Sequence, residues 1–333
     1  MQRPLVALVL AGGVGTRLYP ASRSHRPKQF LHFGGDDSLL ARTVDRVGFA
    51  DEVYVSTQPA FADEVRDHAP RAGVIVEPVA RDTGPALVHA ATRIREQVGE
   101  CVVLALPSDH LVEGSFAEAA HRGARVAVET EGVVTFGIEP TRPATEYGYI
   151  RPGTDHSGYF SVDQFVEKPT ESRARSFHDR GFYWNSGMFA FTPAALVRCA
   201  RDSSLAPLVA ALSAGEPERG FDAVEPVSVD RAIMERTDDA YVVPAALEGD
   251  DLGSWDAPRR VGKLDEDGSA VLSEGLLLDA TGNVVASDGA HVSLVGVSGL
   301  VVAAYDDRVL VVPVEEAQRV REVVGTLQSH DRF

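Results

Sequence analysis

The chain has 333 residues, 44% of them hydrophobic, which is enough for one large α/β domain and a smaller appendage. Its formal net charge of −17 argues against nucleic-acid binding, which needs a broad basic surface, and no apolar run reaches the ~20 residues that span a bilayer. The amino terminus opens directly into an apolar run without a signal-peptide pattern, so we expect a cytoplasmic protein. Cys101 and Cys199 form no metal or redox motif and are expected to be buried thiols.

The first part of the chain alternates apolar strand-like runs with helical patterns. Strands joined by helices predict an α/β fold whose parallel sheet is covered on both faces. Such sheets bind ligands at the carboxyl ends of their strands, where the loops begin. Strands are predicted at 5–10, 52–56, 74–77 and 101–106, with helices at about 39–47, 60–68 and 85–98.

The pattern changes after about residue 264. Short strand-like pieces broken by Gly, Asn and Asp follow, and the amphipathic stretch 315–327 indicates a terminal helix. We therefore predict a catalytic domain at 1–263 and a small β-rich domain at 264–333, the second serving packing or dimerisation. The predicted short strands are 276–278, 283–286, 291–296, 300–304 and 308–312.

Residues 10–18, Leu-Ala-Gly-Gly-Val-Gly-Thr-Arg-Leu, form a glycine-rich loop directly after the first strand. Glycines let backbone N–H groups approach phosphate oxygens closely. A Rossmann loop would need glycine where Leu18 stands, and a Walker A loop would need Gly-Lys-Ser/Thr. The loop is therefore a third kind of phosphate loop, and an NAD-dependent dehydrogenase is a poor alternative.

A cluster of cations follows this loop in an otherwise acidic chain. One interpretation is a solvated basic segment. The adjacent glycine loop favours another, a clamp for a triphosphate, because arginine offers a planar fork and lysine a compact charge. Lys28 is one of only three lysines in the chain, which supports a functional role. The cations are Arg17, Arg23, Arg26 and Lys28.

The glycine loop, together with Arg-Pro-Lys-Gln-Phe at 26–30, resembles the signature of sugar-nucleotide pyrophosphorylases, and most of all the mannose-1-phosphate guanylyltransferases. This resemblance implies a Rossmann-like nucleotidyltransferase domain with a mixed, mostly parallel sheet and a short left-handed β-helix-like C-terminal domain with a terminal helix. It implies transfer of GMP from GTP to mannose 1-phosphate, giving GDP-mannose and pyrophosphate, and we expect a homodimer. Matching segments continue in chain order at 77–86, 106–110, 147–150, 165–169, 183–189 and 251–255.

Such a reaction brings two anions together, so charge neutralisation is its main requirement. Mg²⁺ held by one or two carboxylates meets that requirement. Asp109 ends an apolar strand where a ligand pocket should open, although capping a helix or turn is the alternative role. The resemblance implies that Asp251 is the second metal ligand. A sugar phosphate is already ionised, so we expect direct in-line displacement with no general base.

The resemblance also implies the roles of individual residues. The catalytic residues would be Arg17, Lys28, Asp109 and Asp251. Nucleotide-binding residues would be Leu10, Ala11, Gly12, Gly13, Gly15, Thr16, Asp82, Thr83, Pro85 and Ser108. Sugar-phosphate-binding residues would be Gly148, Glu167, Lys168 and Asn185, where Gly148 would admit the sugar and the Asn185 amide suits neighbouring hydroxyls.

Two alternatives stay open. The residue types do not distinguish guanine from thymine or uracil, so another pair such as glucose 1-phosphate with dTTP or UTP would fit the same chemistry. A catalytically silent paralogue that binds GDP-mannose and regulates a partner is the other alternative. Retention of Arg17, Lys28, Asp109 and Asp251 together favours an enzyme.

Overall fold

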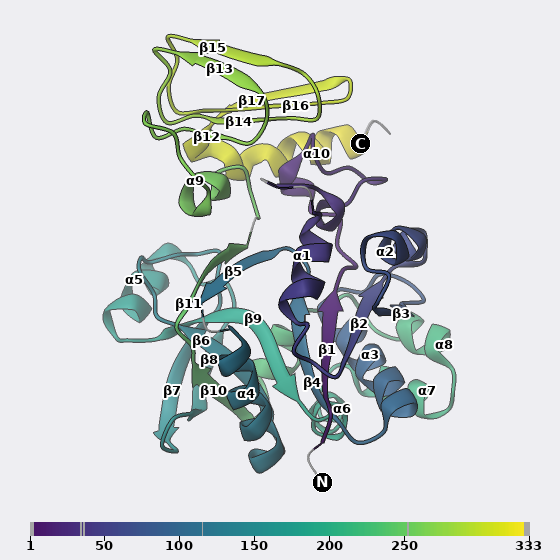
Figure 1. Cartoon of the computed structure of the whole chain (residues 1–333). Coiled ribbons are helices and arrows are strands. Elements are labelled where there is room, and N and C mark those ends of the chain that lie inside the picture. Colours follow the sequence, from purple (N-terminus) through teal and green to yellow (C-terminus); the bar gives the residue numbers. More distant parts are fainter. Residues whose placement is uncertain (1–2, 34, 36, 115, 252, 330–333) are drawn as a thin grey trace. The chain divides into compact units, whose positions relative to one another are not determined.

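The structure is a computed structural model that describes residues 3–329 apart from 34, 36, 115 and 252, without the side chains of 111–114, 248–251 and 261. Its chain divides into two compact units (Figure 1). Each unit is built from three separate stretches of the chain, so the predicted domain boundary at residue 263 stays a prediction. The first unit comprises Met1–Gly12, Val44–Pro107 and Glu113–Glu248; the second comprises Gly13–Thr43, Ser108–Val112 and Gly249–Phe333.

A nine-stranded mixed sheet forms the centre of the first unit, in the order β3-β2-β1-β4-β9-β6-β10-β8-β7 (Figure 1). Neighbours among β3, β2, β1 and β4 pair in parallel, as predicted from their apolar runs, and antiparallel pairing prevails from β9 onward. The strands are β1 Leu5–Leu10, β2 Glu52–Thr57, β3 Gly73–Val76, β4 Val102–Pro107, β6 Val133–Ile138, β7 Tyr149–Asp155, β8 Phe160–Val166, β9 Tyr183–Phe191 and β10 Ala240–Pro244.

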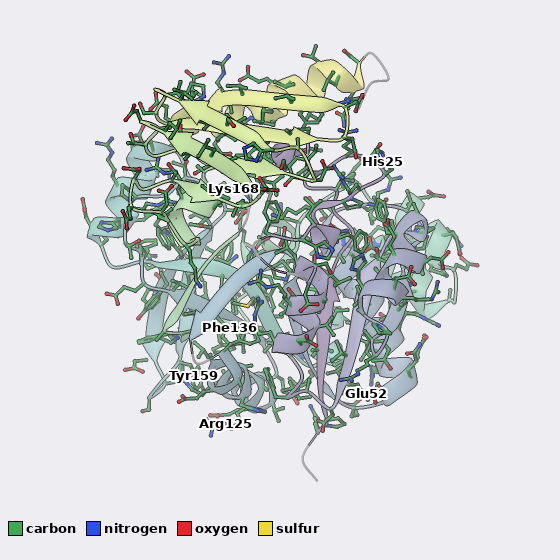
Figure 2. All side chains as sticks on the ribbon, turned by 45° about the horizontal axis from the view of Figure 1, so that its top comes forward. His25, Glu52, Arg125, Phe136, Tyr159 and Lys168 are labelled. Atoms are coloured by element: carbon green, nitrogen blue, oxygen red, sulfur yellow. The ribbon has the colours of Figure 1, made fainter. Side chains whose placement is uncertain are left out.

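Helices cover both faces of this sheet. Successive side chains of a strand point to opposite faces, and on β9 Phe189 and Phe191 join the large core beneath α3 and α6. Ala190 lies on the other face, where Gly123 of α4 packs so closely on Phe136 (labelled in Figure 2) that a Cβ would lie 2.5 Å from the ring. The helices are α2 Ala62–His68, α3 Thr83–Val98, α4 Phe116–Thr130, α5 Glu171–Asp179, α6 Pro193–Arg201, α7 Ala206–Ser213 and α8 Pro217–Asp222.

The second unit contains a β-helix-like stack of short strands. β12, β14 and β16 pair in parallel in one sheet, and β13 pairs with β15 in another. This confirms the predicted β-rich segment and its terminal helix. Its elements are α9 Ala257–Val261, β12 Ala270–Val271, β13 Gly275–Leu278, β14 Val284–Ser287, β15 Val292–Val295, β16 Leu300–Tyr305, β17 Arg308–Pro313, a 3-10 helix Val314–Arg319 and α10 Val320–Gln328.

The core of the second unit joins residues 18–39 with residues 255–324. Trp255 is fully buried, donates its indole N–H to the Tyr19 carbonyl at 2.8 Å and meets the Phe33 ring edge-on. Val320 and Val324 of α10 belong to the same core. The segment that follows the glycine loop is therefore packed with the C-terminal elements. Helix α1 Leu39–Arg46 and the β5–β11 ladder, His110–Gly114 with Leu247–Asp251, complete the α-helices and strands of the described residues.

Two sequence-based expectations concern the whole chain. Both cysteines are buried and free, and burial raises the pKa of the Cys101 thiol to about 11, so it stays protonated and unreactive. Among the described residues, no helix has the length and apolar character needed to cross a membrane.

Candidate functional site

In the first unit, the first half of the glycine loop is held against the carboxyl end of β2. The Ala11 N–H donates to the Ser56 carbonyl at 2.8 Å, and the Thr57 hydroxyl donates to the Ala11 carbonyl at 3.0 Å. The Gln58 amide donates to the Gly12 carbonyl. The backbone of the loop is therefore fixed at the edge of the sheet where ligands of such folds bind.

A buried carboxyl lies beside this half of the loop. Glu77 follows β3 and is 4% exposed, and its Oε1 accepts a 3.0 Å hydrogen bond from the Ser56 hydroxyl. A Cβ on Gly12 would lie 3.0 Å from the same oxygen, so glycine leaves the room that the carboxyl occupies. Burial raises the pKa of Glu77 to about 7, and the Ser56 bond offsets only part of that rise. Sequence analysis gave Glu77 no role; an acidic residue ending an apolar strand was the available signal.

The second half of the loop, in the second unit, is shaped around Lys28. Gly15 has φ +74°, and a Cβ there would lie 2.5 Å from Lys28 Cβ, so only glycine fits this position. The Lys28 N–H donates to the Val14 carbonyl at 3.1 Å. The Ser22 hydroxyl donates to the Gly15 carbonyl at 2.5 Å. A buried lysine is thus built into the turn of the glycine loop.

Lys28 pairs with Asp109, 2.8 Å from Nζ to Oδ2. Burial alone would raise the pKa of Asp109, but the Lys28 ammonium and His110 outweigh it and lower the pKa to about 2. The carboxylate is therefore ionised at neutral pH. Its side chain is still 32% exposed, so it is accessible to a ligand. The structure thus brings together two residues that the sequence separates by about eighty positions.

Of the two predicted metal ligands, the structure describes the side chain of Asp109 alone. Asp109 has an ionised carboxylate whose oxygens can bind a metal ion. Mg²⁺ in proteins is bound by one or two such carboxylates, together with substrate phosphates and water. The side chain of Asp251, the other predicted ligand, lies outside the described residues. Within the described part of the chain, no group of three or more His, Cys, Asp or Glu is arranged to hold a metal. Magnesium stays a prediction.

The predicted clamp of four cations is wrong for two of its members. Arg23 is buried and donates to the Tyr305 carbonyl at 2.7 Å, and Arg26 lies over the Tyr305 ring at 5.3 Å. Both guanidiniums are used to pack the second unit's own core. Arg17 makes a long 3.5 Å contact with Gln318 at the surface. The closeness of these cations in the sequence did not reveal which of them are directed into the core of the second unit.

The start of α3 in the first unit is strained and tied down. Asp82 has φ 69° and ψ 179°, a region that side chains disfavour, and its carboxylate accepts the Thr83 N–H at 2.7 Å. The Thr83 hydroxyl accepts the Val229 N–H at 3.1 Å, and the Gly84 N–H donates to the Val227 carbonyl at 3.0 Å. The loop that contains the predicted nucleotide-binding residues Asp82 and Thr83 is thereby fixed to segment 227–229.

A second cluster in the first unit contains the predicted sugar-side residues. Lys168 (labelled in Figure 2) has φ +45°, is 57% exposed and pairs with Glu167. The Asn185 amide donates to Asp230 at 2.9 Å. A Cβ on Gly148 would lie 2.7 Å from Glu167 Oε2, so the glycine makes room for this carboxyl, and its role in admitting a sugar stays a prediction.

Asp230 is the residue of this cluster that sequence analysis missed. It begins a π-helical turn, η4 Asp230–Met234, of a kind that often occurs at functional sites. Burial, followed by the charge of Glu167, raises the pKa of Asp230 to about 7, despite Lys168 and the Asn185 hydrogen bond. Asp230 stands outside every matching sequence segment, so only its tertiary surroundings identify it.

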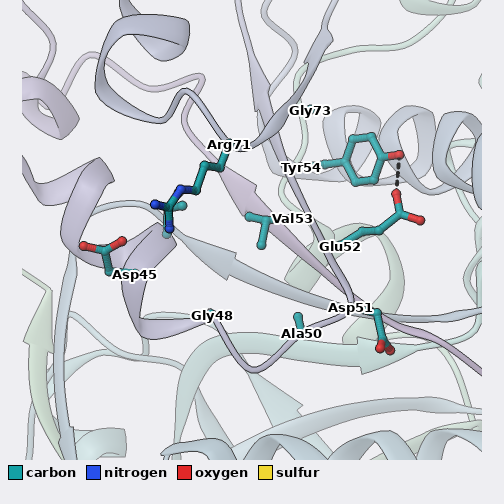
Figure 3. A pocket seen from close by; sticks show the side chains of 10 residues that line it. Asp45, Gly48, Ala50, Asp51, Glu52, Val53, Tyr54, Arg71 and Gly73 are labelled. Carbon is teal, nitrogen blue, oxygen red and sulfur yellow. Dashed lines mark hydrogen bonds between the residues drawn. The ribbon is translucent and has the colours of Figure 1, made fainter.

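One hollow lies away from these clusters. Its volume is about 490 Å³, and Figure 3 shows Asp45, Glu52, Tyr54 and Arg71 around it. Glu52 and Gly73 begin β2 and β3, so the hollow is at the amino ends of these strands. Ligands of parallel sheets bind at the opposite ends, and we assign this hollow no function.

Comparison with known proteins identifies the family. Residues 6–258 match the model described as nucleotidyl transferase, and residues 273–327 match the MannoseP isomerase/GMP-like beta-helix domain. The chain belongs to the nucleotidyl transferase family.

Named relatives of this nucleotidyl transferase cover nearly the whole chain. Xanthan biosynthesis protein XanB of Xanthomonas campestris is 35% identical over 98% of this chain and 74% of its own length. The mannose-1-phosphate guanylyltransferase of Klebsiella pneumoniae is 35% identical over 98% and 75%. A crystal structure described as mannose-1-phosphate geranyltransferase from Thermus thermophilus is 36% identical, covers 98% of this chain and 99% of its own, and has a TM-score of 0.91.

The predicted site residues of this nucleotidyl transferase fall in both units, and their roles stay predictions. The Ser108 carbonyl accepts a hydrogen bond from the Thr43 hydroxyl at 3.2 Å. The first unit contains Leu10, Ala11, Gly12, Asp82, Thr83, Pro85, Gly148, Glu167, Lys168 and Asn185; the second contains Gly13, Gly15, Thr16, Arg17, Lys28, Ser108, Asp109 and the backbone of Asp251.

Proposed function

We propose that this nucleotidyl transferase moves GMP from GTP to mannose 1-phosphate, giving GDP-mannose and pyrophosphate. The observation that carries the reaction class is the Lys28–Asp109 pair, 2.8 Å apart and built against Gly15 of the glycine loop. It sets a fixed cation and an ionised carboxylate beside a phosphate loop. Relatives named mannose-1-phosphate guanylyltransferase support the substrate pair.

The chemistry needs little from the protein beyond positioning and charge. An oxygen of the sugar phosphate attacks the α-phosphorus of GTP, and the bond from that phosphorus to the pyrophosphate oxygen breaks. The attacking oxygen is already ionised, so no proton has to be removed. Lys28 supplies positive charge to the phosphates, together with the backbone N–H groups of the loop. Asp109 would hold Mg²⁺, with Asp251 as the partner that the resemblance implies; the ion, when bound, offsets phosphate charge.

Glu77 supports guanine over the other bases. A carboxylate has two acceptor oxygens, and guanine offers adjacent N–H donors at N1 and N2, which can bond to both. Uracil and thymine flank their single N–H with carbonyl oxygens that a carboxylate repels. Glu77 lies beside Gly12 and bonds to the neutral Ser56 hydroxyl, and GTP binding would supply donors that stabilise its ionised form.

The test measures pyrophosphate release with Mg²⁺ across GTP, ATP, UTP, dTTP and CTP, each with mannose, glucose and N-acetylglucosamine 1-phosphates. We expect the highest rate for GTP with mannose 1-phosphate. Another best pair would correct the substrates, and silence across the panel would favour the regulatory GDP-mannose-binding paralogue.

Glu77→Gln sharpens this test of the base. We expect kcat/KM for GTP to fall roughly 10- to 100-fold, because guanine loses a charged acceptor. Glu118→Gln, an exposed change on α4, is the matched control and should leave the rate unchanged. A Glu77→Gln enzyme with unchanged preference among the five nucleotides would remove Glu77 from the base site. Homodimer formation and cytoplasmic location stay predictions.

A further inference from the structure

Asp230 is held in place by a short chain of hydrogen bonds within the first unit. The Thr135 hydroxyl donates to Asn185 Oδ1 at 2.7 Å, and this fixes the orientation of the amide. Asn185 Nδ2 then donates to Asp230 Oδ1 at 2.9 Å. Thr135 and Asn185 are buried on β6 and β9, two neighbouring strands of the sheet. The carboxyl of Asp230 is therefore oriented by the rigid centre of the fold.

The backbone on both sides of Asp230 is fixed as well. Just before it, the Val229 N–H donates to the Thr83 hydroxyl at 3.1 Å. Just after it, the Glu235 N–H donates to the Asp230 carbonyl at 2.8 Å. Glu235 in turn accepts the Glu167 N–H at 3.0 Å through its carboxylate. The turn that carries Asp230 is thus connected to the end of β8, where Glu167 and Lys168 lie.

The charges around Asp230 select the kind of ligand. A Cβ on Gly148 would lie 2.7 Å from Glu167 Oε2 and 3.3 Å from Asn185 Cβ, so the Glu167 carboxyl lies beside the residue whose amide binds Asp230. The charge of Glu167 also raises the pKa of Asp230. Such a pair repels phosphate and is stabilised by neutral O–H donors. Lys168 pairs with Glu167, and because its side chain is 57% exposed its ammonium can also bind an anion beside the two carboxyl groups. A hexose 1-phosphate has neighbouring hydroxyls, which suit the two carboxyl groups, and one phosphate, which suits the Lys168 ammonium.

We propose that Asp230 binds a hydroxyl of the hexose ring beside Glu167 and helps to determine which hexose 1-phosphate the enzyme accepts. This inference rests on the proposed function. Asn185 acts as a positioning residue, because its amide oxygen accepts the Thr135 hydroxyl and its amide N–H donates to Asp230. A site that hydrogen-bonds a substrate hydroxyl discriminates strongly against analogues that lack it, since its own polar group then stays unpaired.

The main experiment compares wild type and Asp230→Asn on mannose 1-phosphate and on its 2-, 3-, 4- and 6-deoxy analogues. We expect Asp230→Asn to raise KM for mannose 1-phosphate roughly 10- to 100-fold while KM for GTP changes less than about twofold. For one deoxy analogue the substitution should have almost no effect, and that analogue identifies the hydroxyl. An equal loss on every analogue, or an unchanged KM, would overturn the inference.

Two further variants separate positioning from folding. Thr135→Val keeps the side-chain shape but removes the bond to Asn185, and we expect a smaller rise of the same KM, about three- to tenfold. Thr135→Ser keeps the hydroxyl and should restore the wild-type value. If Thr135→Val and Thr135→Ser behave alike, the hydrogen-bonded chain does not orient Asp230.

The control is Asp238→Asn, an exposed aspartate shortly after the same turn. It should leave both KM values unchanged, and thermal unfolding should show all variants folded. Wild type inactive with GTP and mannose 1-phosphate would refute the proposed function itself. Active wild type with an unaffected Asp230→Asn variant would refute only the role of Asp230.

Discussion

The two units of the molecule contain carboxyl groups with opposite properties. In the second unit, Asp109 lies 2.8 Å from the Lys28 ammonium, and its pKa falls to about 2. In the first unit, burial raises the pKa of Glu77 and of Asp230 to about 7. Glu77 accepts its hydrogen bond from a hydroxyl, and Asp230 accepts one from an amide.

This difference indicates different ligands. A carboxylate that stays ionised and has an exposed edge suits a metal ion beside phosphates. A buried carboxyl bonded to neutral groups gains most from further N–H or O–H donors, which a base edge or a sugar ring supplies. Environments that shift like groups in opposite directions are how one protein assigns them different tasks. Substitutions at each kind of carboxyl should therefore damage different steps.

The largest effect is expected at the paired carboxyl. Asp109→Asn removes the charge that would hold Mg²⁺ and leaves the buried Lys28 without its counter-ion, so kcat should fall roughly 10³-fold. Steady-state pyrophosphate release at saturating Mg²⁺ measures this loss. Asp63→Asn, whose side chain is 98% exposed, is the control. Near-wild-type turnover of Asp109→Asn would place catalysis elsewhere.

The next effect concerns the cation of the pair. The three lysines of the chain allow a matched series of Lys→Met substitutions. Lys28→Met should lower kcat roughly 100-fold, because a buried charge directed at phosphates is lost. Lys168→Met should chiefly raise KM for the sugar phosphate, and the exposed Lys263→Met should change neither constant. Equal behaviour of all three variants would contradict the comparison.

The sequence predicted the elements far better than the partners of individual side chains. Apolar runs and glycine breaks identified β1 to β4 and the β-helix-like segment, because these patterns are local, whereas β5 to β11 were not predicted. The inward turn of Arg23 toward Tyr305 depends on a contact 282 residues away. The surroundings of Glu77 and Asp230 likewise depend on burial and on partners from other strands, Ser56 of β2 and Asn185 of β9. Such facts belong to tertiary structure, and no local pattern of residue types contains them.

The buried carboxyl of Glu77 also predicts a pH-dependent stability. Between about pH 4.5 and 7 the unfolded chain loses this proton while the folded chain keeps it, so stability falls as pH rises and then levels off above pH 7. Glu77→Gln lacks this decline. The free energy of unfolding of wild type relative to the variant should therefore drop by about 2–3 kcal/mol across that window. Urea unfolding at pH 5, 6, 7 and 8 measures it, and parallel curves would contradict the buried, uncharged state.

The smallest expected effect tests whether the C-terminal elements support the glycine loop. Trp255→Phe removes the 2.8 Å hydrogen bond to the Tyr19 carbonyl and part of a fully buried ring, which should cost about 1–2 kcal/mol of stability. Trp184→Phe, in the first unit, is the matched substitution. Because Tyr19 follows the glycine loop in the same core, Trp255→Phe should also raise KM for GTP slightly, about twofold, whereas Trp184→Phe should not. A loss of stability without any change in GTP binding would mean that the loop is held by its own turn around Lys28, independently of the C-terminal elements.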